Sequence, residues 1–372
     1  MRELMKAVAA YLTAYLFILQ FALPNVVPDS VVYNYRVNYD LIKDRSTNIE
    51  AVFKHIKKVI DREKPEDYII ILGDSVAYSN PGPSDKSIAR YLNDKAAEAG
   101  RRLQFFNLAV PAAQIGDIYA LLLKMKQYGI SNEHVIMDIA YAGFVMRNPD
   151  PPPVFWFQKQ LQDMDPYSYN QVEKLLLANK KGNTGYNSLP GLVKDRIAEV
   201  GGDLTHKLFE SVSVLSYKDY IQSYLTGVYD SFRGRTQPPQ EVKPWYEKQP
   251  WLGDLLKEYE YQTGFSAAPF VMNETNPQVF FLNKILDIQR GKDTLIFLTA
   301  LNYSLMKNNI DKPGFKENMI RIDNFFRGKQ TGYINFNGSI DYNLFSDHVH
   351  FTPAGYDYLS GRLWDVIKNW NI

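Results

Sequence analysis

The chain has 372 residues, of which 45% are apolar, and a formal net charge of +1. This apolar content can bury the core of one elaborated α/β domain, or of one domain with a large insertion, and it excludes a disordered chain. Acidic and basic residues are mixed throughout, so the charge indicates no nucleic-acid partner. The lack of cysteine excludes disulfides, thiolate metal sites and cysteine nucleophiles.

The N-terminus carries a membrane signal. Arg2 and Lys6 precede an apolar run over 7–23 that only two polar residues interrupt. Its length of roughly 17 residues lies at the lower limit for a helix that spans a bilayer and is long for a signal-peptide core. Because no clear small-x-small cleavage site precedes Pro24, we predict an uncleaved signal anchor at 1–24. A cleaved peptide and a buried amphipathic helix are the alternatives. The basic residues place the rest of the chain outside the cytoplasm.

Short apolar runs and helical patterns alternate along much of the chain. Runs typical of buried parallel strands lie at 68–72, 103–108, 134–140, 294–299 and 332–336. Helical spacing of apolar residues is found at 46–62, 85–99, 115–128, 314–327 and 353–369. The alternation predicts a parallel sheet with helices on both faces.

The alternation is interrupted between Tyr141 and Gln289. We predict a helical cap insertion at 142–290, within an α/β domain that spans 25–372, over the carboxyl edge of the sheet. Helical patterns in it lie at 171–179, 192–200 and 250–261. The insertion is rich in tryptophan and tyrosine, which could stack on sugar rings or pack the cap, and the sequence leaves both interpretations open.

The first predicted strand ends in Gly73-Asp74-Ser75. In an open α/β sheet, functional groups gather at the carboxyl ends of the strands. A serine between a strand and a helix is exposed close to backbone N–H groups that can stabilise negative charge. Ser75 is therefore a candidate nucleophile, although the tripeptide alone is also a common turn sequence.

A second motif, Asp347-His348-Val349-His350, precedes the last predicted helix. A serine nucleophile needs a base to accept its proton, and the base needs a carboxylate that fixes its tautomer. A loop at this strand end can present both groups toward Ser75. The alternative is a turn-forming aspartate with two exposed histidines, and the residues alone leave open which histidine would face the serine.

Gly73-Asp74-Ser75, with Asp347-x-x-His350 and its continuation Thr352-x-x-Gly355-Tyr356, resembles the first and last blocks of the SGNH (GDSL) hydrolase superfamily. The resemblance covers about residues 65–140 and 290–372. It implies a flavodoxin-like three-layer sandwich with a five-stranded parallel sheet. It also implies Ser75 as nucleophile, His350 as base and Asp347 as the carboxylate that orients it. We expect no cofactor, and no metal site, because His348 and His350 are the only close histidine pair and no paired carboxylate motif accompanies them.

The second block departs from the family pattern. Ala112 stands where the family has a glycine whose N–H helps to bind an oxyanion. With a negative φ at Ala112, its N–H and that of Ser75 could still form this oxyanion hole.

The third block lacks the asparagine side chain that the family uses as a further donor. Tyr141 and Asn302 are the candidate replacements, and Asn302 could instead be a turn former. Asp74, Tyr141 and His348 are the remaining candidates for substrate binding.

These departures, the anchor and the insertion are similar to divergent SGNH-like proteins of cell-envelope modification, such as those of alginate O-acetylation and teichoic-acid D-alanyl transfer. The resemblance implies an extracytoplasmic O-acyltransferase, with acetyl as the expected acyl group, that acts on a cell-envelope or secreted polysaccharide and is anchored in the lipid bilayer. A membrane-bound O-acyltransferase partner would supply the acyl donor. The alternatives are an SGNH carbohydrate esterase or deacetylase and a non-catalytic glycan-binding or scaffold protein.

Overall fold

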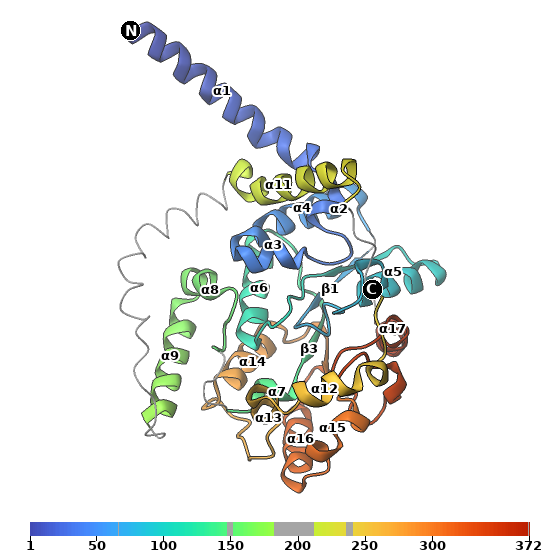
Figure 1. Ribbon diagram of the computed structural model, residues 1–372. Helices are drawn as coiled ribbons and strands as arrows, with labels where there is room; N and C mark the ends of the chain where they lie inside the picture. The colour runs from blue at the N-terminus through green and yellow to red at the C-terminus, as the bar shows by residue number, and fades with distance from the viewer. Residues whose placement is uncertain (66, 147–151, 182–211, 236–240, 371) are drawn as a thin grey trace. The chain divides into compact units, whose positions relative to one another are not determined.

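The computed structural model describes residues 1–65, 67–146, 152–181, 212–235, 241–370 and 372 (Figure 1). The helical pattern predicted at 192–200 lies outside them. The chain divides into two compact units. The first unit draws on residues 1–62 and 183–238, and the second, here called the sheet unit, on residues 63–182 and 239–372.

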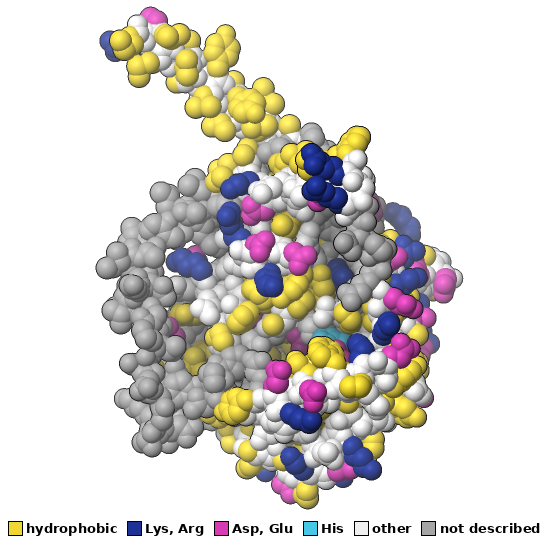
Figure 2. Space-filling view, in the orientation of Figure 1, with side chains coloured by type: hydrophobic (Ala, Val, Ile, Leu, Met, Phe, Trp, Pro, Cys, Tyr) yellow, Lys and Arg dark blue, Asp and Glu magenta, His cyan; other side chains and the backbone are white. Residues whose placement is uncertain are grey.

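The first unit is helical. Its elements are α1 (Arg2–Val26), α2 (Asp29–Val32), α3 (Tyr39–Asp44), a 3-10 turn η1 (Ser46–Asn48), α4 (Ile49–Glu63) and α11 (Ser213–Phe232). The span Arg2–Ala22 of α1 is long and apolar enough to cross a membrane, and none of it is buried. Figure 2 shows hydrophobic side chains along the length of this helix. The amphipathic α4 instead buries Val52, Phe53 and Ile56.

The sheet unit contains five parallel strands, each at a predicted run and within one residue of it at either end. They are β1 (Asp67–Leu72), β2 (Leu103–Asn107), β3 (His134–Ile139), β4 (Asp293–Leu298) and β5 (Gly332–Asn335). Their order is β2-β1-β3-β4-β5. The chain leaves β1 toward β2 and returns to β3 on its other side. The carboxyl end of β1 is thus a topological switch point, where ligands bind in open α/β sheets.

Helices cover both faces of this sheet. Those that connect or follow the strands are α5 (Ile88–Glu98), α6 (Ile115–Gln127), α14 (Pro277–Ile288), α15 (Tyr303–Ile310), α16 (Pro313–Phe326) and α17 (Pro353–Ile367). Helix α5 packs against α17, and α6 packs against α14. Right-handed crossovers place these pairs on opposite faces. The centres of β1, β3 and β4 are buried on both sides, which is why they read as continuous apolar runs, whereas the edge strand β5 is only partly buried. The predicted flavodoxin-like three-layer sandwich is confirmed.

The range predicted as one cap insertion is divided in the structure. The sheet unit holds α7 (Tyr141–Phe144), α8 (Gln158–Met164), α9 (Pro166–Lys181), η3 (Trp245–Lys248), α12 (Gln249–Leu255) and α13 (Tyr259–Gly264). Helix α11 belongs to the first unit, because Tyr220 is buried there and its hydroxyl donates to the Asn48 carbonyl at 3.0 Å. Helix α14 is the crossover between β3 and β4.

Candidate active site

The Gly73-Asp74-Ser75 turn follows β1 directly and is held against the loop after β2. The Gly73 carbonyl accepts the N–H of Val110 at 3.0 Å. The buried Asn107 side chain donates to the carbonyl of Ala77 at 2.7 Å. These bonds fix Ser75, which is half-buried, at the switch point of the sheet.

The loop between β5 and α17 is shaped by its own side chains. Asp347 Oδ1 accepts the N–H groups of Val349 and His350 at 2.9 and 2.8 Å. Thr352 caps α17 by accepting the Gly355 N–H at 3.2 Å. A Cβ at Gly355 would overlap a backbone carbonyl oxygen of the preceding loop, so only glycine allows this close approach. The motif therefore fixes the position of its own histidine and carboxylate.

Three side chains of these two segments form a hydrogen-bonded series. His350 Nε2 lies 2.8 Å from Ser75 Oγ, and His350 Nδ1 lies 2.8 Å from Asp347 Oδ2. The side chains of His350 and Asp347 are only 16% and 18% exposed. Serine, imidazole and carboxylate in this order are the groups that nucleophilic acyl transfer requires.

Electrostatics determine where the protons lie. Burial alone would raise the pKa of Asp347, but the charge of His350 and its hydrogen bond hold that pKa well below its usual range. Burial alone would lower the pKa of His350, but Asp347, with a smaller contribution from Asp74, brings it above 6.5. An ionised Asp347 only accepts hydrogen bonds, so Nδ1 of His350 carries a hydrogen. In the neutral ring, Nε2 is then free to accept the hydroxyl hydrogen of Ser75.

Asp138, near the end of β3, holds the nucleophile turn, residues 73–77, by hydrogen bonds to its backbone. Its carboxyl oxygens accept the N–H of Asp74 at 2.8 Å and of Ala77 at 3.0 Å. Burial, and then the charge and hydrogen bond of the Asp74 side chain, raise the pKa of Asp138 well above its usual range. A Cβ at Gly73, where φ is 143°, would overlap Asp138 Oδ1, so this carboxyl also explains the glycine. The Asp74 side chain thus pairs with Asp138 and also accepts a backbone N–H at 2.8 Å, while its predicted contact with substrate stays a prediction.

Sequence reasoning missed Asp138, although it lies within the third block, which spans 135–144. The signal was an acidic residue inside an otherwise apolar buried run, Val135-Ile136-Met137-Asp138-Ile139. Such a residue is costly to bury unless it is hydrogen-bonded, and so indicates a partner nearby.

The backbone at Ala112 differs from the expectation. Its φ is 63°, in the left-handed region that favours glycine, and not negative. This residue therefore adopts a conformation suited to the glycine of the family pattern, at a cost in strain. No described residue accepts a hydrogen bond from the N–H of Ser75 or of Ala112. Both N–H groups are therefore available as oxyanion donors.

Asn302 holds the histidine loop and is not an open donor. It is fully buried, and its Nδ2 donates to the Asp347 carbonyl at 3.1 Å, while its N–H donates to the His348 carbonyl at 2.9 Å. Its Oδ1 caps α15 by accepting the Leu305 N–H. The structure thus corrects its assignment from oxyanion donor to positioning residue.

Tyr141 is a core residue. It is 1% exposed, its hydroxyl donates to the Ser266 carbonyl at 2.7 Å and accepts from Asn318 Nδ2 at 2.9 Å, and its ring stacks on Phe315. Burial raises its pKa to about 12. Its only hydroxyl hydrogen is used inside the protein, so the structure corrects its assignment as oxyanion donor or substrate contact.

The ring of His348 also lies inside the protein. It is 7% exposed and meets the rings of Tyr261 and Phe265 edge-on, at centroid distances of 5.0 and 5.5 Å. Burial lowers its pKa to about 4, against the opposite effect of Asp347. Of the two histidines, His350 therefore faces Ser75, while His348 packs against Tyr261 of α13 and Phe265.

An aromatic pair lies beside the loop that carries Ala112. Phe155 and Trp156 meet edge-on at 4.7 Å, and the Trp156 indole N–H donates to the Pro111 carbonyl at 2.8 Å. The buried Asp117 carboxyl fixes this segment by accepting the N–H groups of residues 155, 156 and 157 at 2.8 to 2.9 Å. Burial, offset in part by these bonds, raises the pKa of Asp117 to about 6. Phe155 remains 44% exposed and packs on Trp156, which contacts the loop that carries Ala112.

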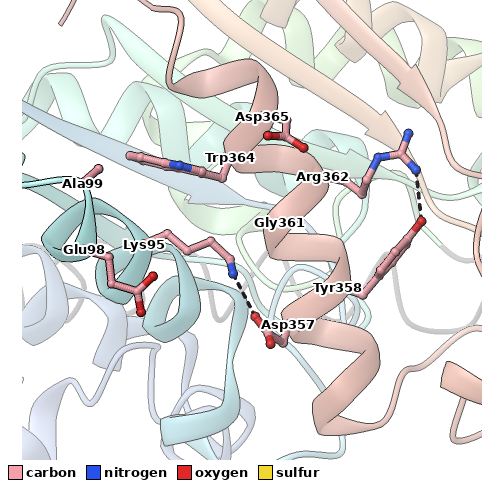
Figure 3. A pocket seen from close by; sticks show the side chains of 9 residues that line it. All are labelled: Lys95, Glu98, Ala99, Asp357, Tyr358, Gly361, Arg362, Trp364 and Asp365. Carbon is pink, nitrogen blue, oxygen red and sulfur yellow. Dashed lines mark hydrogen bonds and ion pairs between the residues drawn. The ribbon is translucent and has the colours of Figure 1, made fainter.

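A surface pocket lies between α5 and α17, away from this chemistry (Figure 3). Lys95 and Asp357 form an ion pair of 3.0 Å across it, and Arg362 donates to the Tyr358 hydroxyl at 3.2 Å. None of its lining residues belongs to the series of Ser75, His350 and Asp347.

No family model matches this chain, and no curated protein matches its sequence. Among solved structures, it is similar to a member of the lipolytic protein G-D-S-L family from Veillonella parvula, with 9% sequence identity and a TM-score of 0.36. The match covers 82% of this chain and 100% of that chain. A TM-score of this size gives no information on the site, whose chemistry follows from the geometry of its own residues.

Proposed function

We propose that this protein is an extracytoplasmic serine-dependent O-acyltransferase that transfers an acyl group, most simply acetyl, to a hydroxyl of a cell-envelope or secreted polysaccharide. The observation that carries the proposal is the pair of 2.8 Å contacts that link Ser75 to His350 and His350 to Asp347. Groups in this order activate a serine hydroxyl for attack on an acyl carbon.

The reaction has two halves. His350 Nε2 takes the hydroxyl hydrogen as Ser75 Oγ bonds to the acyl carbon, and the N–H groups of Ser75 and Ala112 bind the oxyanion. His350 then passes that proton to the leaving group of the donor, and an acyl-serine remains. In the second half, His350 accepts the proton of the sugar hydroxyl, the sugar oxygen bonds to the acyl carbon, and Ser75 Oγ recovers a proton as it leaves.

The aromatic pair supports a sugar as the acceptor. Phe155 is 44% exposed, it packs on Trp156, which donates to the Pro111 carbonyl, and the buried Asp117 holds its backbone in place. Aromatic faces pack against the apolar faces of sugar rings, and a rigid platform loses little entropy when it binds one. We assign Phe155 to the acceptor side of the site.

The acyl donor is proposed to come from the membrane. Helix α1 would anchor the chain in the bilayer, where a membrane-bound O-acyltransferase partner could deliver the acyl group to Ser75. A carbohydrate esterase would use the same residues with water as the acceptor. Ser75 is only half-buried, so water can reach it, and the esterase is therefore the second candidate function.

Product analysis tests the proposal. The purified chain is incubated with an activated acetyl ester, with and without candidate glycans, and both acetate and acetylated glycan are quantified. The expected result is acetyl-glycan that depends on Ser75, whereas release of acetate alone in every case would establish the esterase. The matched control is Ser339→Ala, at an exposed serine of the same unit, which should leave turnover unchanged.

A further inference from the structure

The second half of α11 presents a stripe of exposed apolar side chains. Leu225, Val228, Tyr229 and Phe232 are 59%, 37%, 51% and 89% exposed. Together with the half-buried Ile221 they occupy positions i, i+4, i+7, i+8 and i+11, which lie on one face of a helix. These five residues are called the α11 stripe.

The first half of α11 is fixed to the first unit on a different face. Tyr220 is fully buried, and the Asp219 carboxylate accepts from Asn48 Nδ2 at 3.0 Å. Lys54 donates to the hydroxyl of Ser216 at 3.0 Å. Since the helix is held by these contacts, it cannot rotate to bury the stripe without breaking them.

Helix α11 begins at the end of the candidate membrane span. It packs against α1, and the Ser213 N–H, in its first turn, donates to Gln20 Oε1 at 2.6 Å. Gln20 lies two residues before the end of the span Arg2–Ala22. Figure 1 shows α11 lying crosswise at this end of α1. If α1 crosses a bilayer, α11 lies at the level of its outer surface.

The residues around the stripe suit a bilayer surface. Exposed Tyr224, beside the stripe, and Tyr229, within it, have the amphipathic rings that are enriched at membrane interfaces. The Arg233 guanidinium lies 4.7 Å from the Tyr229 ring centre, and the exposed Arg235 follows it. Basic and aromatic residues that flank an apolar face are typical of helices that lie in the membrane plane.

We propose that α11 is a membrane-surface helix whose stripe enters the headgroup and acyl-chain boundary of the bilayer that α1 spans. The inference rests on the proposed anchoring by α1. The stripe is proposed to contact lipid and not a membrane protein. The first unit then meets the bilayer at two places, a spanning helix and a helix in the plane of the surface.

Because the chain has no cysteine, single cysteines give an unambiguous test. The full-length chain is reconstituted alone in phosphatidylethanolamine–phosphatidylglycerol nanodiscs, with nitroxide labels on Leu225→Cys, Phe232→Cys, Thr226→Cys and Leu12→Cys. Collision rates with oxygen, which concentrates in lipid, and with a water-soluble nickel chelate report the depth of each label. Thr226 is the matched control, because it is exposed and adjacent to Leu225 but about 100° around the helix.

The proposal predicts a higher ratio of oxygen to nickel accessibility at Leu225 and Phe232 than at Thr226, with Leu12 the most lipid-exposed label. Equal, water-like values at Leu225, Phe232 and Thr226, with Leu12 in lipid, would overturn it. A water-exposed Leu12 would refute the anchoring by α1 itself, and with it this inference. Lipid contact at Leu225 should also decrease in the Phe232→Glu variant.

Discussion

Nε2 of His350 lies 2.8 Å from Oγ of Ser75, although 275 residues separate the two in the chain. The contact joins the switch point after β1 to the loop before α17. Because Nδ1 is occupied by Asp347, only a neutral ring can accept the serine proton. The protonation of His350 therefore controls the activity expected of the site.

Activity should rise with pH through the His350 pKa. That pKa lies above 6.5, so half of the maximal kcat/KM is expected above pH 6.5. In the Asp347→Asn variant the negative charge is lost, so this acid limb should move to lower pH, while kcat falls by about 10³–10⁴-fold because the tautomer is no longer fixed. The measurement is a pH–rate profile of the acetyl ester between pH 5 and 9. An acid limb that stays in place in the variant would show that Asp347 does not control His350.

Asp138→Asn should weaken the nucleophile turn. An amide offers one oxygen where the carboxyl offers two acceptors, so the N–H of Asp74 or of Ala77 loses its partner, at a cost of about 1–3 kcal/mol. Both the free energy of unfolding in urea and the rate of Ser75 acylation should fall. Asp323→Asn is the matched control, since Asp323 accepts from Tyr333 and Asn335 and belongs to no part of the site. If Asp138→Asn were as stable as wild type and acylated at the same rate, Asp138 would not support the nucleophile turn.

The Asp138 carboxyl should also make the free energy of unfolding depend on pH. The folded pKa of Asp138 is raised above 3.8, so above that pH the native state binds a proton that the unfolded state has released. Its contribution to stability therefore decreases as pH rises toward the folded pKa. Urea unfolding at a series of pH values should show this decrease in wild type and a smaller one in Asp138→Asn. Parallel curves would contradict the assignment.

Ala112→Gly should relieve backbone strain. A left-handed φ costs a non-glycine residue about 1–2 kcal/mol, and glycine removes this cost. Glycine also raises the conformational entropy of the unfolded chain, which offsets part of the gain, so the unfolding free energy should rise by about 0.5–1 kcal/mol. The N–H donor is kept, so turnover should persist. In the neighbouring control Ala113→Gly, where φ is not positive and the methyl group is buried, stability should fall. Loss of stability in both variants would argue against strain at Ala112.

Phe155→Ala should raise KM for the glycan acceptor by about fivefold to tenfold, for an aromatic contact of about 1–1.5 kcal/mol. KM for a small acetyl ester should not change, because that donor does not need the platform. Trp251→Ala, at a 61% exposed tryptophan of α12, is the control and should leave both values unchanged. Equal effects of Phe155→Ala on both substrates would indicate a general structural role.

The sequence was sufficient for the sheet and for the three residues of the series. Continuous apolar runs are typical of buried parallel strands. Ser75 follows the end of β1, and Asp347 and His350 lie in the loop before the last helix, on the side of the sheet where functional groups gather. It was not sufficient where a role depends on a neighbour distant in the chain. Asn302 resembles a turn former until its bond to the Asp347 carbonyl is seen, and Asp138 is explained only by the backbone it supports. The sign of φ at Ala112 and the placement of α11 in the first unit are likewise set by tertiary contacts.

The most direct test of the central claim is intact-mass analysis of the folded chain after exposure to an activated acetyl donor. We expect one added acetyl group in wild type, none in Ser75→Ala, and slow addition in His350→Ala, with the acetyl group mapped to Ser75 by peptide sequencing. Equal acetylation of wild type and Ser75→Ala, or a label that maps elsewhere, would contradict Ser75 as the nucleophile.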